Sequence, residues 1–242
     1  MEKQITYENL SSFAYTNDAI CQKPICGIVL AFSGLGRAGM VRDDTAHGLY
    51  FAKYGILYIN PYVDPWCWMN RQAVAFTDEL IDAVFTHYGL PEDFPIVSTG
   101  GSMGGQCALV YSVYAKRAPI ACVANAPVCD VPYHFTERDD LPRTFYNALF
   151  GYAEPLEAAL RSISPIDLVD RMPDIPYSIF HGECDKAVDL QMHSARFFEK
   201  MKANGKNITL TRIPMAGHCQ LVPPFENEYL EIAKSAILAR KQ

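Results

Sequence analysis

Seven residues near the middle of the chain read Thr99-Gly100-Gly101-Ser102-Met103-Gly104-Gly105 and contain the pattern G-x-S-x-G. A strand-length apolar segment, 95–99, precedes them, and a segment of helical pattern, 103–116, follows. A serine on a sharp strand-to-helix turn has a strained backbone, and glycines two residues to either side avoid a collision where strand and helix converge. The pattern therefore predicts a nucleophilic serine at 102. A glycine-rich turn that merely caps a helix is the alternative. A phosphate-binding loop is disfavoured because no lysine follows the glycines.

On both sides of this turn, apolar segments of strand length alternate with longer segments of helical pattern. Strands are predicted at 25–32, 56–60, 95–99, 120–124, 177–181 and 207–213, and helices at 41–54, 72–87, 103–116, 190–202 and 227–240. Repeated strand–helix units build a mostly parallel sheet with helices on both faces. The segment from about 130 to 174 breaks the alternation and is too long for a simple connection. We expect one α/β domain over 1–242, with a small insertion at about 130–174 and helical patches at 144–149 and 155–162.

The composition is typical of a soluble globular protein and excludes several classes. Half of the 242 residues are hydrophobic, 20% are charged, and the net charge is −6. A net negative chain is not attracted to nucleic acid or to anionic lipid, so neither is expected as a partner. No apolar run is long enough to span a membrane, and no secretory signal is recognisable. We therefore expect a cytoplasmic protein whose eight cysteines are reduced.

Two downstream segments offer the partners that a serine nucleophile needs. A serine hydroxyl is a weak nucleophile without a base, and the base needs an orienting acid. Asp185 follows the predicted strand 177–181, and His218 follows the predicted strand 207–213. The carboxyl ends of parallel strands meet at the edge of the sheet where ligands bind. Glu183 and Asp189 are alternative acids, but Asp189 is better placed to cap the helix that follows it.

Three motifs occur in a defined order: Gly100-x-Ser102-x-Gly104, His181-Gly182-x-x-Asp185-x-x-Val188 and Gly217-His218. In these motifs the chain resembles serine hydrolases of the α/β-hydrolase fold, nearest in pattern to the small esterase and prolyl-oligopeptidase-like branch. The resemblance extends from about residue 25 to the end. It implies that Ser102 is the nucleophile, Asp185 the acid and His218 the general base.

The resemblance also implies a reaction. Ser102 would cleave a carboxylic ester of a small substrate through an acyl-enzyme, with no metal or organic cofactor. A peptidase or aminoacyl hydrolase of the prolyl-oligopeptidase type is the alternative, and a non-catalytic binding protein of the same fold is a further one. An unperturbed histidine titrates near ~6.5, and the carboxylate of Asp185 favours the charged form, so the pKa of His218 is expected near or somewhat above that value. The ratio kcat/KM should therefore rise between about pH 6 and 8 as His218 loses its proton.

An oxyanion hole needs two donors aimed at the developing negative charge. The Met103 N–H is expected to supply one. The loop Phe32-Ser33-Gly34-Leu35-Gly36 is expected to supply the other. The Leu35 N–H is the favoured second donor, with the Gly34 N–H and the Ser33 hydroxyl as alternatives.

Aromatic residues near the same edge of the sheet are candidates for the substrate pocket. Trp66 and Trp68 follow the predicted strand 56–60, and Tyr133 and Phe145 belong to the insertion. The tryptophans are equally compatible with a place in the core. Three arginines, Arg37, Arg42 and Arg143, are candidates for an anionic substrate group, although solvent exposure explains them as well. A metal site built from His181, Asp185, Asp189 and His193, spaced by four, is disfavoured because Gly182 and the preceding strand interrupt any helix.

Overall fold

A seven-stranded sheet forms the centre of the computed structural model, which describes residues 5–37, 39–41 and 43–241. The strands are β1 (Ala14–Thr16), β2 (Gly27–Phe32), β3 (Ile56–Pro61), β4 (Ile96–Gly101), β5 (Ala121–Asn125), β6 (Tyr177–Gly182) and β7 (Ile208–Ile213). Their order across the sheet is β1-β3-β2-β4-β5-β6-β7. All neighbouring pairs are parallel except β1 with β3, which is antiparallel. The predicted α/β architecture is therefore confirmed, and the short edge strand β1 is an addition to it.

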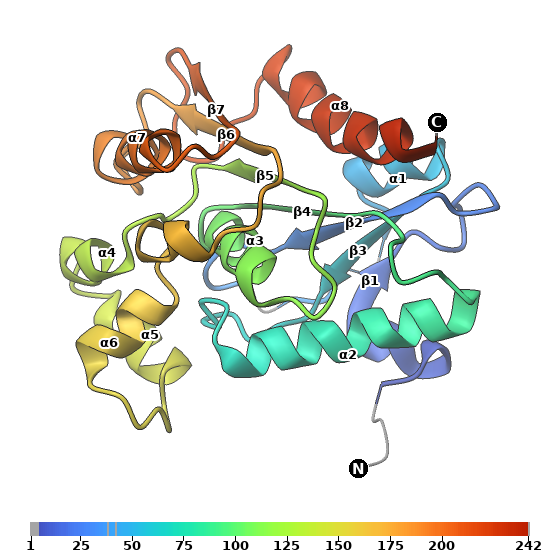
Figure 1. Ribbon diagram of the computed structural model, residues 1–242, viewed down its shortest axis with the longest axis horizontal. Coiled ribbons are helices and arrows are strands. Elements are labelled where there is room, and N and C mark those ends of the chain that lie inside the picture. The colour runs from blue at the N-terminus through green and yellow to red at the C-terminus, as the bar shows by residue number, and fades with distance from the viewer. Residues whose placement is uncertain (1–4, 38, 42, 242) are drawn as a thin grey trace.

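Helices cover both faces of this sheet (Figure 1). The α-helices are α1 (Ala46–Ala52), α2 (Arg71–Tyr88), α3 (Met103–Tyr114), α4 (Val131–Glu137), α5 (Pro142–Ala148), α6 (Leu156–Ser162), α7 (Arg196–Ala203) and α8 (Phe225–Leu238). Shorter helical turns are η1 (Tyr7–Ser12), η2 (Pro165–Arg171), the π-helical η3 (Gln191–Ala195) and η4 (Ala239–Lys241). In Figure 1, α2 and α3 lie on one side of the sheet, and α1 and α8 lie on the other. No helix among the described residues has the length and apolar character needed to cross a bilayer.

The apolar core is divided by the sheet into two clusters. Along β2, Ile28 and Leu30 pack in the cluster that contains α2, α3 and α7, whereas Val29 and Ala31 pack in the cluster that contains α1 and α8. All six residues of β2 are buried, which explains why its sequence is continuously apolar rather than alternating. The sheet is therefore rigidly held from both faces, and its carboxyl edge can position side chains accurately.

The insertion between β5 and β6 contains α4, α5, α6 and η2, which lie together to one side of the sheet (Figure 1). Helices α5 and α6 correspond to the two predicted helical patches, but α4 was not predicted. Its start is marked by Asp130, whose carboxylate accepts the Tyr133 N–H at 3.0 Å, and by a proline in the first turn.

One predicted helix is much shorter than expected. The segment 41–54 becomes helical only at Ala46, because Thr45 caps the helix by accepting the Gly48 N–H at 2.9 Å. Arg42 lies outside the described residues.

Candidate active site

Ser102 lies at the turn between β4 and α3, with a φ of 58° and a ψ of −126°. A non-glycine residue adopts such a conformation only where its surroundings enforce it. A Cβ atom at Gly100 would lie 2.3 Å from the Gly104 carbonyl oxygen, and one at Gly104 would lie 2.2 Å from the Phe32 carbonyl oxygen. These backbone atoms cannot yield, so both positions require glycine for the steric reason inferred from the sequence. The Ser102 N–H is anchored by the Asn125 carbonyl at 2.9 Å.

Asp185 and His218 meet across two loops at the carboxyl edge of the sheet. Asp185 follows β6, His218 follows β7, and the Asp185 Oδ2 atom lies 2.7 Å from the His218 Nδ1 atom. The other carboxylate oxygen, Oδ1, accepts the backbone N–H groups of Ala187 at 2.8 Å and Val188 at 3.0 Å. The Asp185 side chain is fully buried, whereas the His218 side chain is 30% exposed. The acid is thus fixed in orientation, and the imidazole can reach a ligand.

His181 supports Asp185 from the floor of the site. It is the penultimate residue of β6 and is fully buried. Its Nε2 atom lies 3.0 Å from the Val188 carbonyl oxygen and 3.3 Å from Asp185 Oδ2. Because both neighbours of Nε2 are acceptors, Nε2 bears the proton, and Nδ1 accepts the Ser194 hydroxyl at 2.7 Å. The sequence suggested a structural role for this histidine. In the structure, His181 holds the candidate acid Asp185 in position.

The pKa shifts follow from this network. Burial alone raises the pKa of the Asp185 carboxyl, but hydrogen bonds from His181, His218 and two backbone N–H groups outweigh it and hold the pKa well below its usual range. The hydrogen bond to Asp185 raises the pKa of His218 well above its ordinary value. Contact with Cys219 adds to this increase, and burial opposes it. Asp185 is therefore ionised across the neutral range.

Cys219 occupies the space between His218 and the serine turn. Its Sγ atom lies 3.7 Å from His218 Nε2, and its backbone has a φ of 55°. A Cβ atom at Gly101 would lie 3.1 Å from the same Sγ atom, so the second glycine of the turn provides room for the thiol. No hydrogen bond joins Ser102 Oγ to His218 Nε2 among the described residues. Both residues nevertheless line one cavity, and such contacts are often long before substrate binds.

The segments expected to supply the oxyanion donors are the start of α3 and the loop after β2. Met103 begins α3, where backbone N–H groups have no partner within the helix. Leu35 and Gly34 line the cavity from the loop after β2, and a Cβ atom at Gly34 would lie 3.9 Å from Ser102 Cβ. The Ser33 hydroxyl lies 3.2 Å from Asn60 Nδ2 and 3.4 Å from Asn60 Oδ1. The Ser33 hydroxyl is thus already hydrogen-bonded to Asn60. The Leu35 N–H stays the predicted second donor, with the Gly34 N–H as the alternative.

The cavity around Ser102 has a volume of about 620 Å³ and receives only one of the four predicted pocket aromatics, Trp68. Trp68 is itself 1% exposed and stacks on Phe145 with ring centres 4.2 Å apart. Phe145 is fully buried behind it, and Tyr133 lines a separate hollow beside Arg196. Trp66 lies over the Arg143 guanidinium instead. Phe145, Tyr133 and Trp66 therefore lie outside this cavity.

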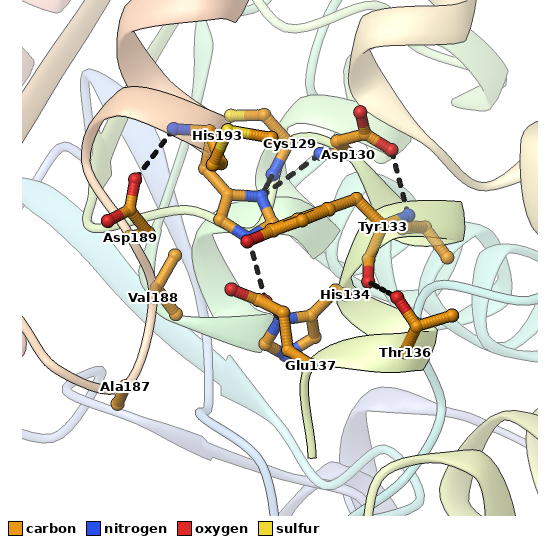
Figure 2. Close-up of polar contacts among 12 residues, drawn as sticks. Cys129, Asp130, Tyr133, His134, Thr136, Glu137, Ala187, Val188, Asp189 and His193 are labelled. Carbon is orange, nitrogen blue, oxygen red and sulfur yellow. Dashed lines mark hydrogen bonds and ion pairs between the residues drawn. The ribbon is translucent and has the colours of Figure 1, made fainter.

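Three side chains that could not be selected from the sequence form a cluster at the cavity. His134 lies in the cavity wall, and Glu137 and His193 lie behind it. His134 and Glu137 of α4 meet His193 of η3, and their ligating atoms all lie within 4.8 Å of one another (Figure 2). His134 and Glu137 are three residues apart on one helix, but His193 is 56 residues beyond Glu137, so no local motif predicts the group. The spaced set considered in the sequence is not assembled, because His193 contacts Glu137 whereas His181 contacts Asp185.

A strained serine turn, a buried aspartate bonded to a partly exposed histidine and a mostly parallel sheet together define a serine hydrolase of the α/β-hydrolase fold. The chain belongs to the prolyl oligopeptidase family, whose model matches residues 74–234. A sequence search of curated proteins found no match.

Solved structures share this fold at low sequence identity. Esterase 2 of Thermogutta terrifontis is 20% identical with a TM-score of 0.67, and the match covers 94% of this chain and 89% of that one. A puromycin-hydrolyzing peptidase of Mycobacterium tuberculosis is 18% identical with a TM-score of 0.70, and the match covers 90% of this chain and 35% of that one. An acylaminoacyl peptidase is 14% identical with a TM-score of 0.66, covering 91% and 38%.

Proposed function

We propose that the protein hydrolyses carboxylic esters of small substrates through an acyl-enzyme on Ser102. His218 Nε2 takes the proton as Ser102 Oγ attacks the ester carbonyl, and the tetrahedral oxyanion is stabilised by the Met103 N–H and an N–H of the loop after β2. His218 then gives the proton to the leaving alcohol. Water, deprotonated by His218, attacks the acyl-enzyme. His218 returns that proton to Ser102 Oγ as the bond between Oγ and the acyl carbon breaks, and the carboxylic acid is released.

The observation that supports this proposal most directly is the 2.7 Å contact between Asp185 Oδ2 and His218 Nδ1, next to a cavity that His218 and Ser102 share. The contact places the proton on Nδ1, because Asp185 is ionised and accepts it. Nε2 is then left as a base on the side of the ring away from Asp185. Asp185 also stabilises the imidazolium that forms when Ser102 loses its proton.

A fluorophosphonate probe tests the nucleophile. The wild-type protein should be labelled on Ser102, and Ser102→Ala should be neither labelled nor active, with kcat reduced by roughly 10⁴- to 10⁶-fold. A matched variant, Ser112→Ala, changes another serine of α3 that lies outside the cavity and should react normally. Labelling of a different residue, or of none, would contradict the proposal and favour a non-catalytic binding protein.

A second candidate is a peptidase or aminoacyl hydrolase that uses the same residues. Family membership favours it, as does structural similarity to a puromycin-hydrolyzing peptidase. The esterase match, by contrast, covers most of both chains. Parallel assays of aminoacyl 4-nitroanilides and 4-nitrophenyl esters of varied acyl length separate the two. A higher kcat/KM for the anilides would reverse the order of the candidates.

A further inference from the structure

A histidine in the wall of the Ser102 cavity is held in place by a partly buried carboxylate. His134 is 3% exposed, lines the cavity, and directs its Nδ1 atom at Glu137 Oε2. The same carboxylate oxygen lies 3.1 Å from the Nε2 atom of His193 (Figure 2). Glu137 thus faces two imidazole rings, an arrangement that superficially resembles a metal site.

The hydrogen bonds of His193 argue against a metal. Its Nδ1 atom accepts the backbone N–H groups of Cys129 and Asp130, each at 3.2 Å. Nδ1 must therefore present a lone pair, and the ring proton lies on Nε2, where it is donated to Glu137. A metal would need the Nε2 lone pair while Nδ1 donates to an acceptor, as ligating histidines do. The cluster is thus a carboxylate that accepts hydrogen bonds from two neutral imidazoles.

The same reasoning fixes the protons of His134. Burial lowers the pKa of His134, and the Glu137 contact opposes this only in part, so the ring is neutral at pH 7. Its single proton lies on Nδ1, which faces the carboxylate, and Nε2 has a lone pair. Within the described part of the chain, Nε2 has no hydrogen-bond donor, and it is not among the buried polar atoms without a partner. His134 therefore presents a free acceptor to the cavity.

The rest of the cavity wall limits what can bind this acceptor. Asn125 lines the same cavity, and its buried Oδ1 atom has no donor among the described residues. An unpaired buried acceptor is costly, and a donor from a ligand or water would relieve that cost. The described lining residues include Arg37 and Arg138 but no aspartate or glutamate. The His134 acceptor near the Arg138 guanidinium suits a neutral donor better than an ammonium group, and its lone pair repels a carboxylate.

We propose that His134, supported by Glu137 and His193, binds a hydroxyl group of the substrate, so that the preferred esters have a hydroxyl on the acyl or alcohol part. This assignment rests on the proposed ester hydrolysis at Ser102. His134 determines specificity without taking part in the proton transfers.

Matched esters test the assignment. The pairs are propyl butyrate with 2,3-dihydroxypropyl butyrate, and ethyl butyrate with ethyl 3-hydroxybutyrate; choline butyrate is the cationic probe. In at least one pair, the wild-type protein should favour the hydroxylated ester by about tenfold in kcat/KM. His134→Phe should abolish that preference by lowering kcat/KM for the hydroxylated ester about tenfold more than for the plain ester. Tyr133→Phe, on the same helix but outside the cavity, should keep the preference. If His134→Phe does not fold, Glu137→Gln should still reduce the preference severalfold.

A binding assay separates this inference from the proposed function. Calorimetry with Ser102→Ala should show tighter binding of the hydroxylated ester, even if the wild-type protein cleaves neither ester. Three results would overturn the inference: equal binding and equal kcat/KM within both pairs, a preference for choline butyrate, or stoichiometric zinc that Glu137→Gln removes.

Discussion

Asp185→Asn is the most informative single substitution because the structure dictates how the new amide must lie. Asp185 Oδ1 accepts two backbone N–H groups, from Ala187 and Val188, so this position must remain an oxygen. The NH₂ group then replaces Oδ2, which lies 2.7 Å from His218 Nδ1. An amide donor at that position stabilises the tautomer that has its proton on Nε2. His218 then has no lone pair facing the substrate and cannot act as a base.

The expected loss is large and specific to catalysis. A wrong histidine tautomer reduces kcat by about 10⁴-fold in comparable triads, which corresponds to about 5 kcal/mol of transition-state stabilisation. The new NH₂ group faces the His181 Nε2–H at 3.3 Å, so some stability should be lost. The fold should persist, because His181 Nε2 keeps the Val188 carbonyl as an acceptor at 3.0 Å. Steady-state hydrolysis of 4-nitrophenyl esters and thermal unfolding measure the two effects separately.

Asp189→Asn is the matched control for this substitution. Asp189 was the alternative acid, but its carboxylate accepts the Met192 N–H at 2.8 Å and caps the following turn, a role that asparagine can also fill. Its activity should remain close to that of the wild type. An Asp185→Asn protein with kcat/KM within about tenfold of wild type, or an inactive but folded Asp189→Asn protein, would refute the assignment of the acid.

Three further substitutions test the surroundings of the site. The Cys219 contact helps to raise the pKa of His218, and only neutral His218 is a base. The pH at which kcat/KM reaches half its plateau should therefore lie above ~6.5 in the wild type and move lower in Cys219→Ala. An unchanged pH profile would exclude this coupling. Gly104→Ala places a Cβ atom 2.2 Å from the Phe32 carbonyl oxygen and should lower the free energy of unfolding in urea by about 1–3 kcal/mol or more. Gly39→Ala is the control and should be neutral, because nothing lies within 4 Å of the added Cβ atom. Trp68→Ala removes a buried, stacked ring and should lower the free energy of unfolding by about 3–5 kcal/mol. Trp66→Ala should lower it by less than about 1 kcal/mol in the same assay. Equal losses would show that Trp66 is also a core residue.

The serine turn can be predicted from sequence because its requirements are local. Gly100 and Gly104 avoid backbone atoms only a few residues away or on the adjacent strand, so one short motif records the constraint. Asp185 and His218 can also be predicted, since each follows an apolar strand whose carboxyl end must reach the same edge of the sheet. The strained position of Ser102 and the mostly parallel sheet agree with those expectations.

The cavity wall could not be predicted, because it depends on contacts between distant segments. His134 and His193 come from elements that follow β5 and β6 and meet only through the fold. Trp68 shows the same limit: its loop position allowed either a pocket or a core, and stacking on Phe145 of the insertion determines the result. The pKa of His218 could be predicted in part. Its aspartate partner already implies a value near or somewhat above the ~6.5 of an isolated histidine, whereas the further increase from the Cys219 contact depends on the conformation of the loop after β7.

The distribution of charge has a consequence for how product leaves. The chain has a net charge of −6, yet none of the described residues that line the cavity is acidic, and Arg37 forms no ion pair within the described part of the chain. The proposed ester cleavage would turn a neutral substrate into a carboxylate inside that cavity at neutral pH. The new anion would be attracted by Arg37 and repelled on its way out by the net negative charge of the chain, so both interactions oppose its release. Carboxylate products should therefore inhibit competitively at low ionic strength, and added salt should speed their release by screening both interactions.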